Sequence, residues 1–190
     1  MTTDLKEQVL DASVQLIAEQ GLTGLSMREV ARRAGVSHQA PYHHFQDKAA
    51  IVAALVERGF TRLAERLETA SVSGTVAQRL ERAGRAYVDF ALAEPVYFSL
   101  LFRPELTDLK RFPPVEAAGA RAFAVLRRLV EEKAGPRTER AKMDALVSMH
   151  WSLVHGLATL LVDGPLGVTF PHGPTRDRHV EQVLTLFATG

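Results

Sequence analysis

Apolar residues recur at helical spacing along the whole chain, and no stretch alternates apolar and polar residues as a strand would. Capping residues, glycines and prolines separate these stretches and mark where helices begin and end. Thr3 is the expected cap of the first helix and Gly21 its stop. The pattern predicts a short helix after Ser26 and further helices over 4–20, 37–44, 48–69, 76–93, 97–102, 115–133, 138–162 and 176–189, with a loop over 164–174.

The predicted helix over 48–69 divides the chain. Asp47 is its expected N-cap, and its inward stripe is Ile51, Leu55, Leu63 and Leu67. The fold class we predict is all-α: an N-terminal three-helix helix-turn-helix domain joined by this long helix to a C-terminal helical bundle. The two predicted domains are residues 1–47, which hold the three short helices, and residues 48–190, which hold the bundle.

Residues 26–48, SMREVARRAGVSHQAPYHHFQDK, hold the most specific pattern. Ser26 and Glu29 have the spacing of a capping box, in which each side chain accepts from the other residue's backbone amide. Gly35 permits the left-handed backbone that ends a helix, and Ser37 is the expected cap of the next one. That next helix carries mostly polar side chains, which is typical of the recognition helix of a helix-turn-helix.

A short helix, a glycine turn and another helix also occur in proteins that bind no nucleic acid. Here the caps and the turn share one register with Tyr42, Phe45 and Lys48. This agreement favours DNA binding.

The same residues resemble the N-terminal signature of TetR/AcrR-type transcriptional repressors. The matching positions are Ser26, Val30, Ala31, Ala34, Gly35, Val36, Ser37, Tyr42, His44, Phe45 and Lys48. The chain departs from the signature at Pro41, where an aliphatic residue is usual, so the recognition helix is expected to begin irregularly. Trp151, His155 and Gly156 resemble a Trp-His-Gly feature of one subgroup.

The resemblance implies which side chains meet DNA. Tyr42 and Lys48 would anchor phosphates, while Gln39 and His38 would read bases. The full predicted set is Ser26, Arg28, Ser37, His38, Gln39, Tyr42, His43, His44 and Lys48. The expected partner is a palindromic double-stranded operator bound by a homodimer.

Charge adds little to this picture. The chain has a net charge of +1, and residues 1–48 hold five basic and six acidic side chains. This balance counts against a nonspecific electrostatic binder but not against a specific dimer, whose contacts depend on where the charges lie. With 190 residues, of which 46% are hydrophobic, the chain is long enough to bury a core.

The chain has no cysteine, which excludes disulfides and thiolate chemistry. The N-terminus lacks the basic start and apolar run of a signal peptide. Residues 143–162 are apolar enough to suggest a membrane span, but Asp144, His150 and His155 are costly in lipid. We therefore expect a cytoplasmic protein with no membrane partner.

Enzyme motifs are absent, so we predict no catalytic residue and no cofactor. His150 and His155 lie five residues apart, about 140° around a helix, which suits no shared metal ion. Trp151 and His155 do share a face at i, i+4 spacing. Either this histidine is a core residue hydrogen-bonded beside the tryptophan, or the two side chains line a pocket.

The helix over 138–162 and the last helix carry stripes expected at a dimer interface. One stripe consists of small residues that allow close helix approach, and the other is apolar. The predicted interface residues are Ser148, Ser152, Gly156, Thr159, Val180, Val183, Leu184 and Phe187. The alternative is that both stripes pack within one subunit.

Aromatic and methionine side chains in the C-terminal part could surround an unknown small-molecule effector. The predicted pocket residues are Phe98, Phe102, Phe123, Met149, Trp151 and His155. The sequence thus indicates a ligand-responsive homodimeric regulator, with repression favoured over activation. The alternative is a helical small-molecule-binding or interaction module that has lost DNA recognition.

Overall fold

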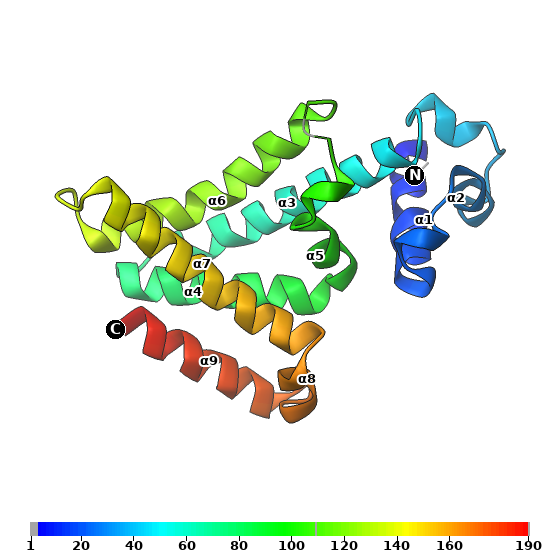
Figure 1. Ribbon diagram of the computed structural model, residues 1–190. Coiled ribbons are helices and arrows are strands. Elements are labelled where there is room, and N and C mark those ends of the chain that lie inside the picture. Colours follow the sequence, from blue (N-terminus) through cyan, green and yellow to red (C-terminus); the bar gives the residue numbers. More distant parts are fainter. Residues whose placement is uncertain (1–3, 109, 190) are drawn as a thin grey trace. The chain divides into compact units, whose positions relative to one another are not determined.

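The computed structural model describes residues 4–108 and 110–189, and these residues form helices and turns with no strand (Figure 1). The all-α prediction is therefore confirmed. The α-helices are α1 (Leu5–Gln20), α2 (Met27–Ala34), α3 (Lys48–Ala70), α4 (Val76–Ala93), α5 (Pro95–Leu101), α6 (Pro113–Ala134), α7 (Arg140–Val162), α8 (Pro165–Thr169) and α9 (Pro174–Thr189). The 3-10 helices are η1 (Leu22–Gly24), η2 (Ala40–His43) and η3 (Pro104–Leu106).

The chain folds as two compact units. Unit 1 comprises Met1–Gly59 and Val96–Ala118, and unit 2 comprises Phe60–Pro95 and Gly119–Gly190. The helices α3 and α6 each contribute residues to both units. The domain boundary between residues 47 and 48 remains a prediction, and α3 begins at that point.

Unit 1 contains the N-terminal helices. Asp4 is the N-cap of α1, because its carboxylate accepts a hydrogen bond from the Lys6 amide at 3.2 Å. The expected cap, Thr3, lies outside the described residues. Val9 and Leu16 of α1 are fully buried, and α1 packs against α2. The apolar side of α1 therefore faces the interior of unit 1.

The helix α5 approaches α3 closely within unit 1. A Cβ atom on Gly59 would lie 2.8 Å from Leu101 Cδ2 and 3.2 Å from Tyr97 Cδ1. To admit a side chain at position 59, Leu101 would have to shift and Tyr97, whose Cβ would lie at 3.3 Å, would have to give way. Glycine at position 59 therefore allows α5 to lie directly on α3.

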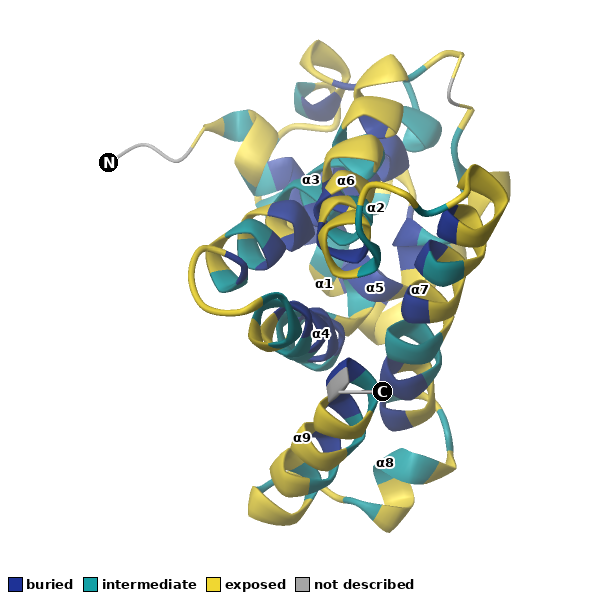
Figure 2. Ribbon diagram, turned by 90° about the vertical axis from the view of Figure 1, so that its left-hand side faces the viewer, coloured by how far each residue is buried: buried dark blue, intermediate teal, exposed yellow. Residues whose placement is uncertain are grey.

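Unit 2 is organised around α4, which packs against both α7 and α9. A Cβ atom on Gly84 would lie 2.8 Å from Leu184 Cδ2, so α9 approaches α4 at this glycine. Buried positions run along α4, whereas α7 and α9 each show buried and exposed faces (Figure 2). The loop predicted over 164–174 contains the short helix α8, which proline initiates at Pro165.

Candidate functional site

The helix α2 is the first helix of the candidate helix-turn-helix, and its N-terminus forms as predicted with one difference. Ser26 Oγ accepts a hydrogen bond from the Glu29 amide at 3.2 Å. The reciprocal half of the predicted capping box is not formed, because the Glu29 carboxylate accepts from Arg32 Nε at 3.0 and 3.1 Å. A guanidinium offers charge-assisted bonds that are stronger than the bond from a neutral amide. The same contact lowers the pKa of Glu29.

The turn after α2 follows the prediction closely. Gly35 adopts the left-handed conformation, with φ 69° and ψ 29°. The Val36 amide donates to Ala31 O at 3.1 Å and the Gly35 amide donates to Arg32 O at 3.3 Å. These two bonds form a Schellman motif, which satisfies the last carbonyls of α2.

The second helix of the candidate helix-turn-helix differs from the prediction. We expected an α-helix over 37–44, and the structure has the 3-10 helix η2 at Ala40–His43. In an α-helix, residue 41 would donate its amide to Ser37 O, but Pro41 has no amide hydrogen and its ring would clash with that carbonyl. The Ala40 amide donates to Ser37 O at 3.0 Å in its place. Ser37 thus supports η2 through its backbone carbonyl.

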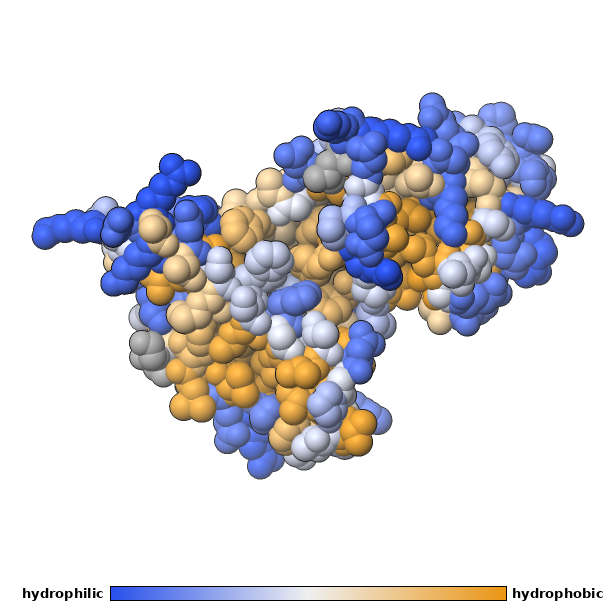
Figure 3. All heavy atoms as spheres, in the orientation of Figure 1, coloured by the Kyte–Doolittle hydropathy of each residue, from blue (hydrophilic) through white to orange (hydrophobic). Residues whose placement is uncertain are grey.

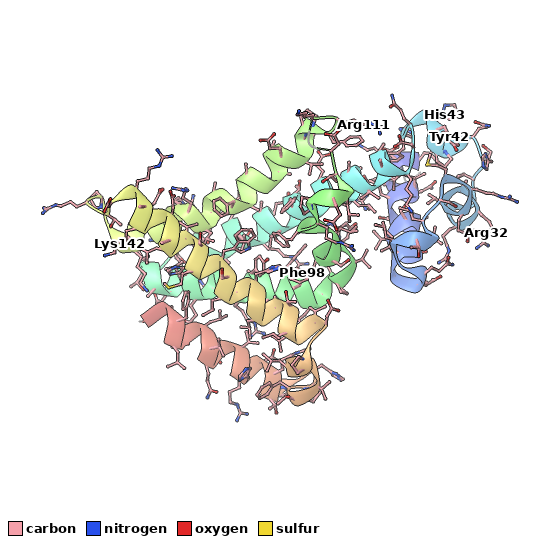
Figure 4. All side chains as sticks on the ribbon, viewed as in Figure 1. Arg32, Tyr42, His43, Phe98, Arg111 and Lys142 are labelled. Atoms are coloured by element: carbon pink, nitrogen blue, oxygen red, sulfur yellow. The ribbon has the colours of Figure 1, made fainter. Side chains whose placement is uncertain are left out.

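The predicted DNA-contacting side chains belong to α2, η2 and the residues beside them in unit 1. All of them are exposed except Lys48, which is half-buried. His38 and Tyr42 lie with their ring centroids 6.0 Å apart, and Tyr42 lies next to His43 on η2 (Figure 4). Below them, Pro41 and Phe45 are buried and fix η2 to the unit. The exposed polar side chains are therefore held in place by the two buried residues Pro41 and Phe45.

Lys48 is tied to the turn before α2. Its Nζ donates to the backbone oxygen of Leu22 at 2.7 Å. An ammonium group has three hydrogens, so two remain for a phosphate. This contact fixes where the predicted phosphate anchor is presented.

A neighbour of this surface was not foreseen from the sequence. Arg111 Nη2 lies 2.6 Å from Asp47 Oδ2, beside the start of α3 (Figure 4). Asp47 also accepts the Ala50 amide at 2.9 Å, which confirms it as the N-cap of α3. The two residues are 64 positions apart, so no local spacing could have indicated the pair.

In unit 2, a hydrogen-bonded chain lies beside the predicted pocket residues. Tyr87 Oη and His155 Nδ1 are 2.9 Å apart, and Trp151 also hydrogen-bonds the Tyr87 hydroxyl. Burial raises the pKa of Tyr87 and lowers that of His155. Trp151 is 38% exposed and its ring meets Phe123 edge-on at 6.0 Å. His155 is hydrogen-bonded, as expected of a core histidine. Trp151 beside it reaches the surface, as expected of a side chain that lines a pocket.

The predicted pocket residues are divided between the two units. Phe98 and Phe102 belong to unit 1, where their rings contact each other at 6.1 Å. Met149 of α7 is 50% exposed. The described contacts therefore unite Phe123, Trp151 and His155, and add Tyr87, which sequence reasoning missed.

The predicted interface residues on α7 face away from the core of unit 2. Ser148, Ser152 and Thr159 are exposed, and a Cβ atom on Gly156 would meet no atom within 4 Å. The helix is long and apolar enough to cross a membrane by length and composition, yet only 28% of its apolar window is buried. In Figure 3, apolar residues gather on the face where Figure 1 shows α7 and α9.

The residues predicted on α9 divide into two groups. Val180 and Leu184 are each 2% exposed, because they pack inside unit 2. They are therefore not available to a partner, which corrects the prediction for these two. Val183 and Phe187 are half-buried, and the Phe187 ring meets the His150 ring at 4.6 Å. Leu186 of the same helix is more exposed than Val183 and Phe187.

Within residues 4–108 and 110–189, no group of three or more histidine or acidic side chains lies close enough to hold a metal ion.

This geometry, two short helices around a tight turn with an exposed polar face, defines a helix-turn-helix regulator, and comparison with known proteins places it in a family. Residues 9–55 match the family of bacterial regulatory proteins named tetR. Residues 80–187 match the tetracycline repressor-like C-terminal domain, and this match spans more than half of the chain. The chain belongs to the tetR family of bacterial regulators.

Individual proteins are similar over most of the chain. The uncharacterised helix-turn-helix regulator YobS of Bacillus subtilis is 23% identical over 156 residues, which cover 82% of this chain and 78% of YobS. The transcriptional activator FasR of Mycolicibacterium smegmatis is 28% identical over 141 residues, which cover 73% of this chain and 64% of FasR. A solved structure of a Rhodococcus protein of unknown function superposes with a TM-score of 0.75 at 29% identity, covering 98% of this chain and 93% of that one. The chain is therefore a DNA-binding transcriptional regulator and not an enzyme.

Proposed function

We propose that the chain acts in the cytoplasm as a homodimeric repressor that a small molecule releases from a palindromic operator. The observation that carries this proposal is the exposed polar face of α2 and η2 above a buried Pro41 and Phe45. In a dimer, two such faces would meet two half-sites about one helical turn apart. Under the rival interpretation, a module without DNA recognition, the chain would select no duplex.

The outward stripe of α7 supports the dimer. Small residues let helices approach closely, and Ser148, Ser152 and Thr159 are exposed along α7, with open space around a Cβ atom on Gly156. We propose that this stripe meets a second copy, together with Val183, Phe187 and the exposed Leu186 of α9. Burying the apolar side of α7 against another subunit also accounts for its hydropathy without a membrane.

The effector site we propose centres on Trp151, Phe123 and His155 of unit 2. An edge-on aromatic pair gives flat apolar contact, and the adjacent Tyr87–His155 hydrogen bond supplies polar atoms for orientation. Such a lining suits a mainly apolar molecule with one or two polar groups. Release of DNA requires that this molecule bind more tightly to the conformation that cannot hold both half-sites.

Three measurements on the full chain test the proposal. Selection from a random duplex library should give an inverted repeat, and a mobility shift on that duplex should survive nonspecific competitor DNA. Light scattering at micromolar concentration should give twice the mass of one chain. A monomer in solution, or a selected site without symmetry, would contradict the dimeric reader.

A further inference from the structure

Asp47 occupies an unfavourable place for an acidic side chain in a DNA-binding surface. It is the N-cap of α3, where its Oδ1 accepts the Ala50 amide at 2.9 Å. The next residue is Lys48, the proposed phosphate anchor, and Tyr42 lies on the preceding helix η2. A bare carboxylate at this point would repel the phosphate that Lys48 attracts, since unit charges interact over about 10 Å at moderate salt.

Arg111 is held against this carboxylate. Its Nη2 lies 2.6 Å from Asp47 Oδ2 and 3.4 Å from Gln46 Oε1. The guanidinium lies over the Phe112 ring, 4.8 Å from the ring centroid. The Arg111 amide donates to Asp108 O at 3.0 Å, so backbone and side chain are both anchored. The contact also lowers the pKa of the Asp47 carboxyl, which therefore stays charged and paired near neutral pH.

We propose that Arg111 is a positioning residue for DNA binding: it neutralises Asp47 so that a phosphate can approach Lys48 and the start of α3. This inference rests on the proposed function and adds a second segment of the chain to the DNA-binding surface. Both side chains are partly exposed, so the pair contributes little to folding stability in water. Its effect appears when a phosphate arrives and the Asp47 charge must be compensated.

The test uses the full chain and the duplex selected with the unmodified protein. Affinity is measured by fluorescence anisotropy for Arg111→Ala, Asp47→Asn and the double variant. Asparagine caps a helix as well as aspartate does, so Asp47→Asn removes the charge and keeps α3 intact. Arg103→Ala is the matched control, because Arg103 lies in the same segment and pairs with Glu105.

Arg111→Ala should weaken binding about tenfold, since one uncompensated charge then faces DNA in each half-site. The double variant should return to within about twofold of the unmodified chain. Asp47→Asn alone should bind at least as tightly as the unmodified chain, and Arg103→Ala should bind equally well.

Two results would overturn the inference. If the double variant binds as weakly as Arg111→Ala, then Arg111 contacts DNA directly and does not act through Asp47. If Arg111→Ala binds normally, the pair has no role in DNA binding. Failure of the unmodified chain to select any duplex would instead contradict the proposed function, so the two failures are distinguishable.

Discussion

The hydroxyl oxygen of Tyr87 lies 2.9 Å from Nδ1 of His155, and this hydrogen bond joins α4 to α7 inside unit 2. Tyr87 is only 6% exposed, whereas Trp151, which hydrogen-bonds the same hydroxyl, reaches the surface. A buried polar group is thereby satisfied directly beneath an accessible aromatic ring. Displacement of the Trp151 ring would break its hydrogen bond to this hydroxyl.

Tyr87→Phe should change the fluorescence emission of Trp151, because the indole loses its hydrogen-bond partner. Trp151 is the only tryptophan of the chain, so the signal comes from one place. We also expect a loss of about 1 kcal/mol in unfolding free energy and weaker binding of any effector that releases DNA. Tyr42→Phe, an exposed tyrosine of unit 1, is the control and should leave the emission unchanged. Unaltered emission in Tyr87→Phe would contradict the hydrogen bond between Trp151 and the Tyr87 hydroxyl.

His150 should make the stability of the protein depend on pH. It is 5% exposed, its Nδ1 contacts Leu146 O at 2.7 Å, and its Nε2 is buried with no hydrogen-bond partner among the described residues. Burial lowers the pKa of this imidazole below its ordinary value of 6.5. The unfolded chain therefore binds the proton first, so stability is complete above about pH 6.5 and is lost as the pH falls from there towards the folded-state pKa.

Thermal unfolding measured between pH 8 and pH 5 checks this dependence. The unmodified chain should lose stability as the pH falls, and His150→Gln should show a flatter profile over the same range. His172, which is exposed, gives the control variant His172→Gln, whose profile should follow that of the unmodified chain. Parallel profiles for His150→Gln and the unmodified chain would show that another group sets the dependence.

Arg58 should hold the N-terminal helix in place within unit 1. It donates to Asp11 Oδ1 at 2.7 Å and to Tyr97 Oη at 3.2 Å, and it also pairs with Glu7. These contacts join α1, α3 and α5, and the guanidinium is largely buried. Arg58→Ala should lower the unfolding free energy by about 1–3 kcal/mol and weaken DNA binding. Urea titration provides the measurement, and a midpoint equal to that of the unmodified chain would contradict the role.

Gly156→Leu should separate the subunits and leave each one folded. A Cβ atom at position 156 meets no atom within 4 Å inside one subunit, so we expect the clash to arise against a second copy, where overpacking costs about 1–3 kcal/mol. Gly84→Leu is the contrasting variant, because its Cβ would already meet Leu184 inside unit 2. Light scattering should show a monomer for Gly156→Leu with the helical circular-dichroism spectrum of the unmodified chain, although loss of the partner lowers its melting temperature. Gly84→Leu should stay dimeric and melt earlier, because its clash lies inside the subunit. A dimer of normal affinity in Gly156→Leu would move the interface elsewhere.

Local patterns predicted much of the fold, for identifiable reasons. Ile51 and Leu55 are fully buried, as their periodicity indicates. Gly35 ends α2 because the turn there requires a left-handed backbone conformation, which glycine adopts readily. Pro41 shows the limit of such patterns. Because proline has no amide hydrogen, residues 40–43 form a 3-10 helix where an α-helix was expected. The complete capping box lies at Thr75 and Gln78, not at Ser26, where Arg32 competes for the carboxylate.

Contacts between distant residues could not be predicted from spacing. Tyr87 and His155 are 68 positions apart, and Arg111 and Asp47 are 64 apart. An apolar stripe on a helix also looks the same whether it packs within the subunit or against a partner. For this reason Val180 and Leu184, which are core residues, were grouped with exposed α7 positions such as Ser152.

Lys48 and Gln39 should show the difference between anchoring and reading DNA. Lys48→Gln removes the charge and leaves an N–H donor on a side chain one atom shorter, so it should weaken binding to all duplexes alike and reduce the salt slope by about one per subunit. Gln39→Ala removes a side chain that can bond adenine at two positions, a contact worth about 1–3 kcal/mol of discrimination. Repeating the duplex selection with Gln39→Ala should therefore relax one base position in each half-site, with the salt slope unchanged. If Lys48→Gln altered the selected sequence and Gln39→Ala did not, the two roles would have to be exchanged between these residues.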